Sequence, residues 1–264
     1  MPSHEATPFG DLLRGWRQRR GHSQLSLSLH AGVSSRHLSF VESGRSRPSR
    51  EMVLHLSRVL QVPLREGNDL LLAAGFAPVH RETPLDGPDL RAANAAIELI
   101  LSHQEPYPAV VLDRRWNLVK GNGAAVRFFA KLLGDRAATG PVNIVRLVFA
   151  DDGLKPWIAN WSEVAEALLD RVRREAVGGV VDAETTALLG EIAGGAPRLP
   201  APGSASQPSA PIVPLCFRKG DLALDFFSTV TTLGTPRDIA LQELRIECFF
   251  PANDATRQSA STAY

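Results

Sequence analysis

Arginine side chains gather near the start of the chain, at a density that suits the binding of phosphate groups. Eight arginines lie from Arg14 to Arg50 with a single acidic residue, Glu42, so these 37 residues have a net charge of +7. Binding of a nucleic acid strengthens with the number of phosphates neutralised. The cluster therefore predicts a surface that faces phosphates, although charge alone fits a solvated basic face without a partner equally well.

Residues in catalytic patterns are scarce. The chain has no G-x-S-x-G motif and no Gly-rich phosphate loop, because Gly121-Asn122-Gly123 is too short. His103 is the only histidine after residue 80, so a multi-histidine metal site or a Ser-His-Asp triad is not expected there. Cys216 and Cys248 are too few for a disulfide framework or a Cys-based zinc site, and core packing is their expected role. We predict neither an enzyme nor a metal site.

The composition is ordinary for a globular chain of one large or two smaller domains: 264 residues, 44% hydrophobic, 22% charged and a net charge of +1. No run of apolar residues is long enough for a membrane span, and the first 15 residues lack the apolar core of a secretory signal, so we expect a cytoplasmic protein. The charge is uneven. Residues 1–80 hold ten basic and six acidic residues, a net +4, whereas residues 81–264 hold 19 and 22, a net −3.

Five short helices must position the arginines. Apolar periodicity, capping serines and helix-ending glycines predict helices over residues 9–20, 24–31, 35–43, 50–60 and 65–74. Ser23, Ser34 and Ser49 are the expected N-caps. The second and third helices are joined by Ala31-Gly32-Val33-Ser34, where glycine permits the tight turn of a helix-turn-helix.

The second helix of such a motif enters the major groove of DNA, and its first residues reach the base edges. Arginine can donate two hydrogen bonds to guanine, and phenylalanine can touch a thymine methyl group. The predicted base contacts are Ser35, Arg36, His37, Ser39 and Phe40. Helix N-termini and the Arg-rich loop would hold the backbone, so the predicted phosphate contacts are Ser23, Gln24, Ser43, Arg45, Arg47 and Arg50. Leu38 and Val41 should point into the core.

The segment SQLSLSLHAGVSSRHLSFVESGRSRPS resembles the Xre-type helix-turn-helix of phage repressors and many bacterial regulators. In that family an arginine of the first helix pairs with the glutamate that ends the recognition helix, so the resemblance implies a structural ion pair between Arg17 and Glu42. Ser28 stands where the family usually has alanine, between the two helices. Together with the charge, this resemblance favours DNA binding over a helical hairpin used for protein contacts.

The second half of the chain mixes helices and strands. Residues 77–90 are rich in proline and turn formers and predict a linker. We expect helices over 90–103, 123–133, 143–149, 160–176 and 183–193, and strands over 109–119, 212–218, 221–231 and 241–250. Residues 194–211 hold five prolines and three glycines, which predicts a mobile loop, and residues 252–264 predict a frayed tail.

Several blocks resemble the MmyB-like regulators over nearly the whole chain, from Phe9 to about Pro251; they include EPYPAVVLDRRWNLV, NWSEVAEALL and FFSTVTTLGTPRDIALQELRIECFFP. The resemblance implies an α+β chain of two domains: an all-α five-helix Xre-type helix-turn-helix domain over residues 1–76, and a PAS-like antiparallel sheet with flanking helices over residues 91–251. It also implies transcription regulation and a small hydrophobic ligand, with a long-chain fatty acid as the precedent.

A ligand of this kind needs an apolar cavity with a few polar anchors. Buried polar residues are informative because each needs a partner, whereas core packing is the alternative role of every aromatic residue. The predicted pocket residues are Asn122, Phe129, Asn143, Arg146, Trp161, Phe227, Thr229 and Thr231. Arg146 is the preferred anchor for an acid, because a charge on an apolar helix is costly unless paired; an ion pair with an acid such as Asp225 is its other possible role.

These patterns predict a ligand-responsive transcription regulator that binds double-stranded DNA as a homodimer. We call the helix-turn-helix domain over residues 1–76 the reader. The two readers of a dimer would bind half-sites about one helical turn apart. We expect no cofactor other than a fatty-acid-like effector, and no membrane partner. Two alternatives stay open. A constitutive DNA-binding protein whose second domain only dimerises predicts a filled core, and an enzyme carrying this reader predicts a catalytic constellation in the second domain.

Overall fold

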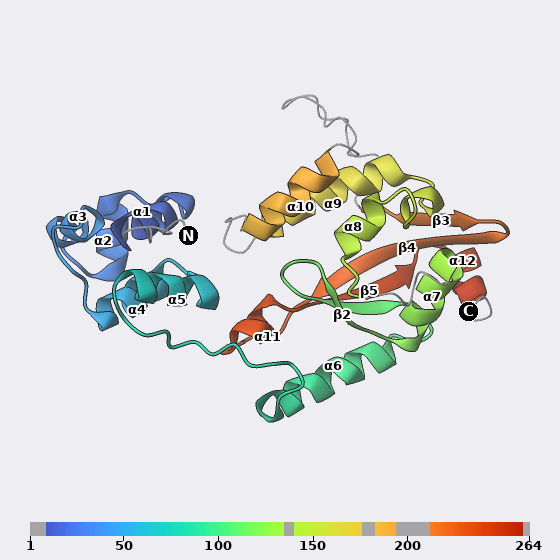
Figure 1. Cartoon of the computed structure of the whole chain (residues 1–264), viewed down its shortest axis with the longest axis horizontal. Helices are drawn as coiled ribbons and strands as arrows, with labels where there is room; N and C mark the ends of the chain where they lie inside the picture. The colour runs from blue at the N-terminus through green and yellow to red at the C-terminus, as the bar shows by residue number, and fades with distance from the viewer. Residues whose placement is uncertain (1–8, 135–139, 176–182, 194–211, 261–264) are drawn as a thin grey trace. The chain divides into compact units, whose positions relative to one another are not determined.

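The computed structural model describes residues 9–134, 140–175, 183–193 and 212–260, which form two compact units (Figure 1). Unit 1 contains the described residues up to Thr83 and also the segment Thr235–Gln242. Unit 2 contains Pro84–Gly234 and the residues from Glu243 onward. The first crossing between the units falls inside the linker predicted from the sequence. In the described parts of the chain, no helix is long and apolar enough to cross a membrane.

Unit 1 is built on five helices, and it confirms the predicted all-α helix-turn-helix fold. They are α1 (Phe9–Arg19), α2 (Gln24–Ala31), α3 (Ser35–Glu42), α4 (Arg50–Val59) and α5 (Leu64–Ala73). Ser23, Ser34 and Ser49 each accept a backbone N–H of the following helix, so local sequence determines where α2, α3 and α4 begin. Gly32 ends α2 with φ of 62°, a left-handed conformation that glycine adopts without strain.

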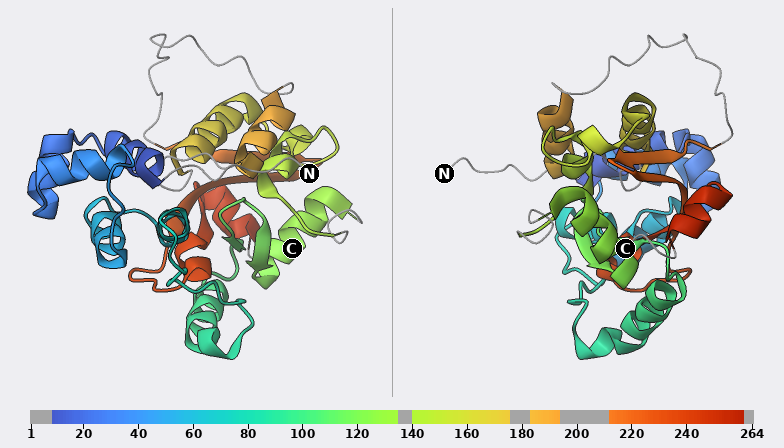
Figure 2. Two further views of the ribbon diagram at one scale, coloured as in Figure 1. Left: turned by 60° about the vertical axis from the view of Figure 1, so that its left-hand side comes forward. Right: turned by 90° about the vertical axis from the view of Figure 1, so that its right-hand side faces the viewer.

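Unit 2 contains a five-stranded antiparallel sheet in the order β2-β1-β5-β4-β3, which confirms the predicted sheet with flanking helices. The strands are β1 (Ala109–Leu112), β2 (Leu118–Gly121), β3 (Leu215–Lys219), β4 (Leu222–Thr231) and β5 (Arg245–Pro251). Helix α6 (Arg91–His103) lies on one face of the sheet. Helices α8 (Ile144–Phe149), α9 (Trp161–Glu175) and α10 (Ala183–Ala193) lie on the other (Figures 1 and 2).

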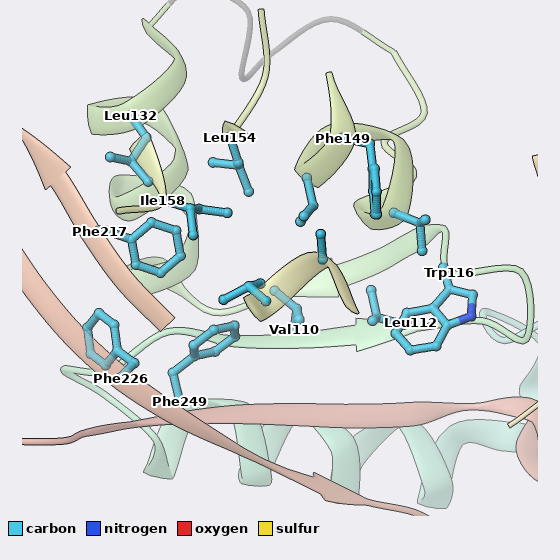
Figure 3. Packing of buried hydrophobic residues seen from close by; sticks show 14 of the residues in the cluster. Val110, Leu112, Trp116, Leu132, Phe149, Leu154, Ile158, Phe217, Phe226 and Phe249 are labelled. Atoms are coloured by element: carbon cyan, nitrogen blue, oxygen red, sulfur yellow. The ribbon is translucent and has the colours of Figure 1, made fainter. Parts of the chain in front are cut away.

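The hydrophobic core of unit 2 lies between the sheet and the second group of helices. Phe217, Phe226 and Phe249 extend from the strands toward Leu154 and Ile158 (Figure 3). Phe128 of α7 (Gly123–Leu133) meets the rings of Phe217 and Phe226 edge to face, with centroid separations of 4.9 and 6.0 Å. Edge-to-face contacts of this kind fix ring orientations beyond simple burial. These contacts therefore help to fix the position of α7 on the sheet.

The predicted single strand over 109–119 is instead a hairpin, β1 and β2. The carboxylate of Asp113 accepts the backbone N–H groups of Arg115 and Asn117, and this side-chain turn reverses the chain. Trp116 within the turn has φ of 67°. The apolar and polar alternation of the segment hid a turn that one aspartate creates.

Two further boundaries near the C-terminus differ from the sequence prediction. The strand expected from residue 241 begins at Arg245, because α11 (Ile239–Glu243) precedes it. The tail expected to be frayed contains α12 (Asp254–Ala260), where the buried Thr256 accepts the backbone N–H of Asp225 in β4. The buried hydrogen bond of Thr256 anchors polar sequence that periodicity alone could not assign. The predicted mobile loop over 194–211 lies outside the described residues.

Candidate DNA-binding surface and ligand cavity

A buried carboxylate ties the first three helices of unit 1 together. The Glu42 side chain has no exposed surface and accepts Arg17 Nε at 2.6 Å and Arg17 Nη2 at 3.1 Å. Gln24 Nε2 donates to the same carboxylate at 2.7 Å, and Arg14 Nη2 donates to the Glu42 backbone carbonyl at 2.9 Å. The ion pair between Arg17 and Glu42 therefore links α1 to the end of α3, while Gln24 links α2 to it. These bonds fix the orientation of α3 relative to α1 and α2.

Close backbone approach reinforces this arrangement. A Cβ atom added at Gly10 of α1 would lie inside contact distance of the Glu42 carbonyl oxygen, so only glycine fits there. Ser28 of α2 is buried, and its hydroxyl donates to the Leu25 carbonyl at 2.8 Å. The serine thus meets its hydrogen-bond requirement within its own helix, which makes it compatible with a helix contact where alanine is usual.

The outward face of α3 carries the predicted base contacts. Ser35 and Arg36 are exposed, and His37, Ser39 and Phe40 are half-buried, whereas the predicted core residues Leu38 and Val41 are buried. The guanidinium of Arg36 lies over the Phe40 ring at 5.3 Å from its centroid, and that of Arg45 lies at 6.0 Å. Cation–π contact keeps both arginines beside the half-buried ring of Phe40. Their contacts with a base edge and a phosphate stay predictions.

The predicted phosphate contacts fall into two groups. Arg45, Arg47 and Arg50 are exposed in the loop after α3 and at the start of α4. Ser23 caps α2, and the Ser43 hydroxyl donates to the Phe40 carbonyl, so both hydroxyls already have protein partners. Gln24 likewise uses its amide on Glu42. Phosphate contact by the arginines and by the first backbone N–H groups of α2 stays a prediction.

Unit 2 holds a cavity of about 400 Å³ between the sheet and helices α7, α8 and α9. Seventeen of its 21 lining residues are apolar. They are Val110, Trp116, Phe128, Phe129, Ile144, Val148, Leu154, Ile158, Val164, Ala167, Leu168, Ile212, Val213, Leu215, Phe217, Val230 and Phe249. A volume of this size with an apolar wall matches the known properties of small-molecule sites.

The four polar lining residues gather together. Arg171 Nη1 of α9 lies 3.0 Å from Glu247 Oε1 of β5, and the Ser228 hydroxyl of β4 donates to the same oxygen at 2.6 Å. Arg174 follows Arg171 by three residues and thus shares its side of α9. Trp116 lines the cavity beside them, with the Arg171 guanidinium 4.8 Å from its ring centroid. One end of an otherwise apolar cavity therefore contains the ion pair of Arg171 and Glu247, and the exposed Arg174 also lines the cavity.

Of the predicted pocket residues, Phe129 lines this cavity and the other seven lie elsewhere. Asn122 and Asn143 act as helix N-caps, accepting the backbone N–H groups of Ala125 and Arg146. Asn122 also receives the Ala109 N–H and donates to two carbonyl groups, so it joins β1, α6 and α7. Asn122 stands directly before a predicted helix and Asn143 at the first position of another, which was the signal for a capping role.

Arg146 and Trp161 are likewise held by partners within the protein. The Arg146 side chain is half exposed and pairs with Glu191 of α10, with Nε 2.8 Å from Oε2, rather than with Asp225. This hydrogen bond raises the pKa of Arg146 and lowers that of Glu191. Trp161 donates its indole N–H to the Val148 carbonyl and meets Phe149 edge to face. Arg146 therefore braces α8 against α10 at the surface.

Phe227, Thr229 and Thr231 occupy the face of β4 turned away from the cavity. Side chains of a strand alternate between its faces, and it is Ser228 and Val230 that line the cavity. Phe227 stacks on Phe250 of β5, with ring centroids 5.6 Å apart. The segment Ser-Thr-Val-Thr-Thr has small polar residues on both faces, so its pattern could not specify which face is inward.

Sequence reasoning missed the polar end of the cavity. Arg171 lies on α9 beyond the apolar residues Ala167 and Leu168, and Glu247 interrupts the apolar strand β5. A charge within an apolar face is the signal that marks both residues, as it marks Arg146.

The two cysteines show no sign of reactivity. Burial raises the pKa of the Cys216 thiol, and the neighbouring Asp225 raises it further. Burial likewise raises the pKa of Cys248. A raised pKa disfavours the nucleophilic thiolate at neutral pH. Within the described ranges, no group of three or more His, Cys, Asp or Glu side chains could hold a metal ion.

A five-helix reader with an Arg-rich loop after its recognition helix, followed by an antiparallel sheet that lines an apolar cavity, defines a DNA-binding transcription regulator with a ligand-binding domain. Residues 8–70 match the family described as "Helix-turn-helix domain". Residues 93–262, more than half of the chain, match "MmyB-like transcription regulator ligand binding domain". The chain therefore belongs to the MmyB-like transcription regulators.

Individual relatives agree with this class. The chain is 42% identical over 55 residues to "Transcriptional regulator ClgR" of Mycobacterium tuberculosis, in strains CDC 1551 / Oshkosh and ATCC 25618 / H37Rv. The match covers 21% of this chain and 49% of ClgR, so it spans about half the length of these curated relatives. The solved "Structure of an RNA-binding Light-Oxygen-Voltage Receptor" aligns over 96% of this chain and 62% of that chain, with 13% identity and a TM-score of 0.30.

Proposed function

We propose that DNA binding by this regulator is controlled by a small, hydrophobic, fatty-acid-like ligand in the cavity of unit 2. The observation that carries the proposal is the composition of the cavity: about 400 Å³ with an apolar wall and one polar end. An apolar space of this size is typical of a site for a small molecule. A domain that only dimerises would have a filled core, and the cavity therefore favours control by a ligand.

The polar end supports an acidic head group. Arg171 and Arg174 line it, and the nearest carboxylate, Glu247, already shares its oxygen Oε1 between Arg171 and Ser228. A ligand carboxylate would accept hydrogen bonds from the guanidinium groups while its hydrocarbon chain contacts the apolar wall. We accordingly assign Arg171 and Arg174 the anchoring role that the sequence pattern suggested for Arg146.

Binding of dodecanoate and of dodecan-1-ol by the full chain tests this assignment. Loss of one charge-assisted hydrogen bond corresponds to about 10- to 100-fold in affinity. Arg174→Gln should therefore weaken dodecanoate at least about 10-fold and leave the alcohol unchanged. Arg173→Gln is the matched control, because Arg173 is exposed on the same helix as Arg174 is, but pairs with Asp170 and does not line the cavity. Equal affinities of wild type and Arg174→Gln for dodecanoate would contradict the anchoring role.

We also propose that the regulator binds DNA as a homodimer. The recognition helix α3 has eight residues, so one reader offers only a short set of base contacts, and a two-fold pair doubles it. DNA selected by the protein from a random pool should contain an inverted repeat with half-sites about ten base pairs apart. Light scattering should give twice the 28.6 kDa mass of the chain. A monomer mass on DNA with a single half-site would contradict dimerisation.

A further inference from the structure

One segment of unit 1 is enclosed in sequence by strands of unit 2. Thr235–Gln242 groups with the helices of the reader, whereas Gly234 before it and Glu243 after it belong to unit 2. The chain thus leaves β4, contributes eight residues to the reader and returns to form β5. These residues make specific hydrogen bonds with the reader.

The first contact completes a helix terminus. Helix α5 begins after Pro63, which provides no side-chain cap. The Gln242 side-chain oxygen instead accepts the Leu64 backbone N–H at 2.7 Å. Because the first N–H groups of a helix have no partner within it, Gln242 supplies from 178 residues away a cap that is usually local.

The second contact holds the chain that follows α5. The Asp238 carboxylate accepts the Thr83 backbone N–H at 3.1 Å and its hydroxyl at 2.7 Å. The Ile239 N–H donates to the Arg81 carbonyl at 2.9 Å, and both Asp238 and Ile239 are buried. Asp238 also accepts the Ala240 N–H at 2.9 Å, so one carboxylate both caps α11 and binds the linker.

The residues bound by this segment are continuous with the reader. Asn68 of α5 is buried and accepts the backbone N–H groups of Val79 and His80 at 3.0 Å each, while donating to the His80 carbonyl at 2.8 Å. Helix α5 in turn packs against α1 and α4. The segment, the linker and α5 are therefore joined by hydrogen bonds, and α5 connects them to the other helices of the reader.

The flanking strands line the cavity. Ser228 and Val230 of β4 precede the segment, and Glu247 and Phe249 of β5 follow it. Five positions separate Val230 from Thr235, and five separate Gln242 from Glu247. A change in β4 or β5 on binding would therefore reach the segment through a few residues of covalent chain.

We propose that Thr235–Gln242 is a coupling segment that carries the state of the cavity to the reader through the N-terminus of α5 and residues 79–83. The ligand that changes this state rests on the proposed function, whereas the route concerns the chain alone. Coupling needs an element whose equilibrium both sites influence. The segment meets this requirement because its hydrogen bonds stabilise the reader while its two ends are fixed to cavity-lining strands.

Hydrogen exchange of the full chain, with the cavity filled by mutation, tests the route without any ligand. Ala167→Phe adds a ring to the cavity, and Ile144→Phe does so from α8 if the first variant does not fold. Ala130→Phe, at an exposed site on α7, is the control. We expect a filled cavity to change the exchange rates of β5 amides and also those of Leu64 and residues 79–83, each by at least about threefold.

Gln242→Ala identifies the contact responsible. This variant should speed exchange at Leu64 about tenfold, the effect of one lost hydrogen bond. With Ala167→Phe added, β5 should still respond while Leu64 no longer does. A filled cavity that alters β5 but leaves Leu64 and residues 79–83 unchanged would overturn the proposal, and so would an unchanged β5. Absence of dodecanoate binding with an intact response to Ala167→Phe would refute the proposed ligand and not the coupling segment.

Discussion

Removal of the Glu42 carboxylate should destabilise the reader more than any change on its surface. The side chain has no exposed surface, and it neutralises Arg17, whose side chain is only 10% exposed. Glu42→Ala leaves that guanidinium buried without its counter-ion and takes the acceptor from Gln24. Breaking a buried ion pair in this way costs about 3–5 kcal/mol. A domain is stable by only about 5–15 kcal/mol, so much of the reader's stability would be lost.

Amide hydrogen exchange in α1, α2 and α3 measures this loss locally, which suits a chain of two units. At about 1.4 kcal/mol for each factor of ten, exchange from the open state should accelerate at least about 100-fold. Asp11→Ala is the control, because the ion pair of Asp11 with Arg14 is exposed and worth less than about 1 kcal/mol. The double variant Arg17→Met/Glu42→Met should lose less than the two single variants combined. Equal acceleration in Glu42→Ala and Asp11→Ala would refute the structural role of the carboxylate.

Three other changes have defined outcomes. Arg36→Ala should weaken specific DNA binding by about 1–3 kcal/mol and relax one base position in a binding assay, whereas an equal loss on random DNA would make it a phosphate contact. Gly10→Ala should cost about 1–3 kcal/mol in denaturant unfolding, while Gly15→Ala in the same helix has space and should stabilise; equal effects would contradict the close approach. The hydrogen bond from Arg218 lowers the pKa of Asp225, so its stabilisation is present above the unfolded pKa and is lost as the pH falls through the folded one. An NMR titration midpoint in the ordinary aspartate range would disprove this.

Local sequence determines most of the reader, and sequence analysis predicted it accordingly. Each of α2, α3 and α4 begins at a capping serine, and Gly32 permits the turn between two helices. Signals of this kind act within a few residues and need no tertiary information. The boundaries of α5 were predicted equally closely, although its cap comes from Gln242, which no local pattern could reveal.

The cavity was harder to predict because its residues come from separate elements. The inward face of β4 is Ser228 and Val230, and only pairing with β5 selects it over Thr229 and Thr231. Arg146 satisfied the rule that a charge on an apolar helix needs a partner, but its partner is on α10 at the surface. The rule identifies a residue with a partner and does not say whether that partner is a ligand.

DNA affinity measured with and without the bound ligand tests ligand control most directly. The full chain would be purified, its bound small molecules identified by native mass spectrometry, and its affinity for selected DNA measured before extraction, after extraction and after dodecanoate is added. Ligand control predicts that extraction changes the affinity at least about tenfold and that dodecanoate restores it, since a ligand shifts an equilibrium by its differential affinity for the two states. Equal affinity in all three preparations would contradict control by a ligand.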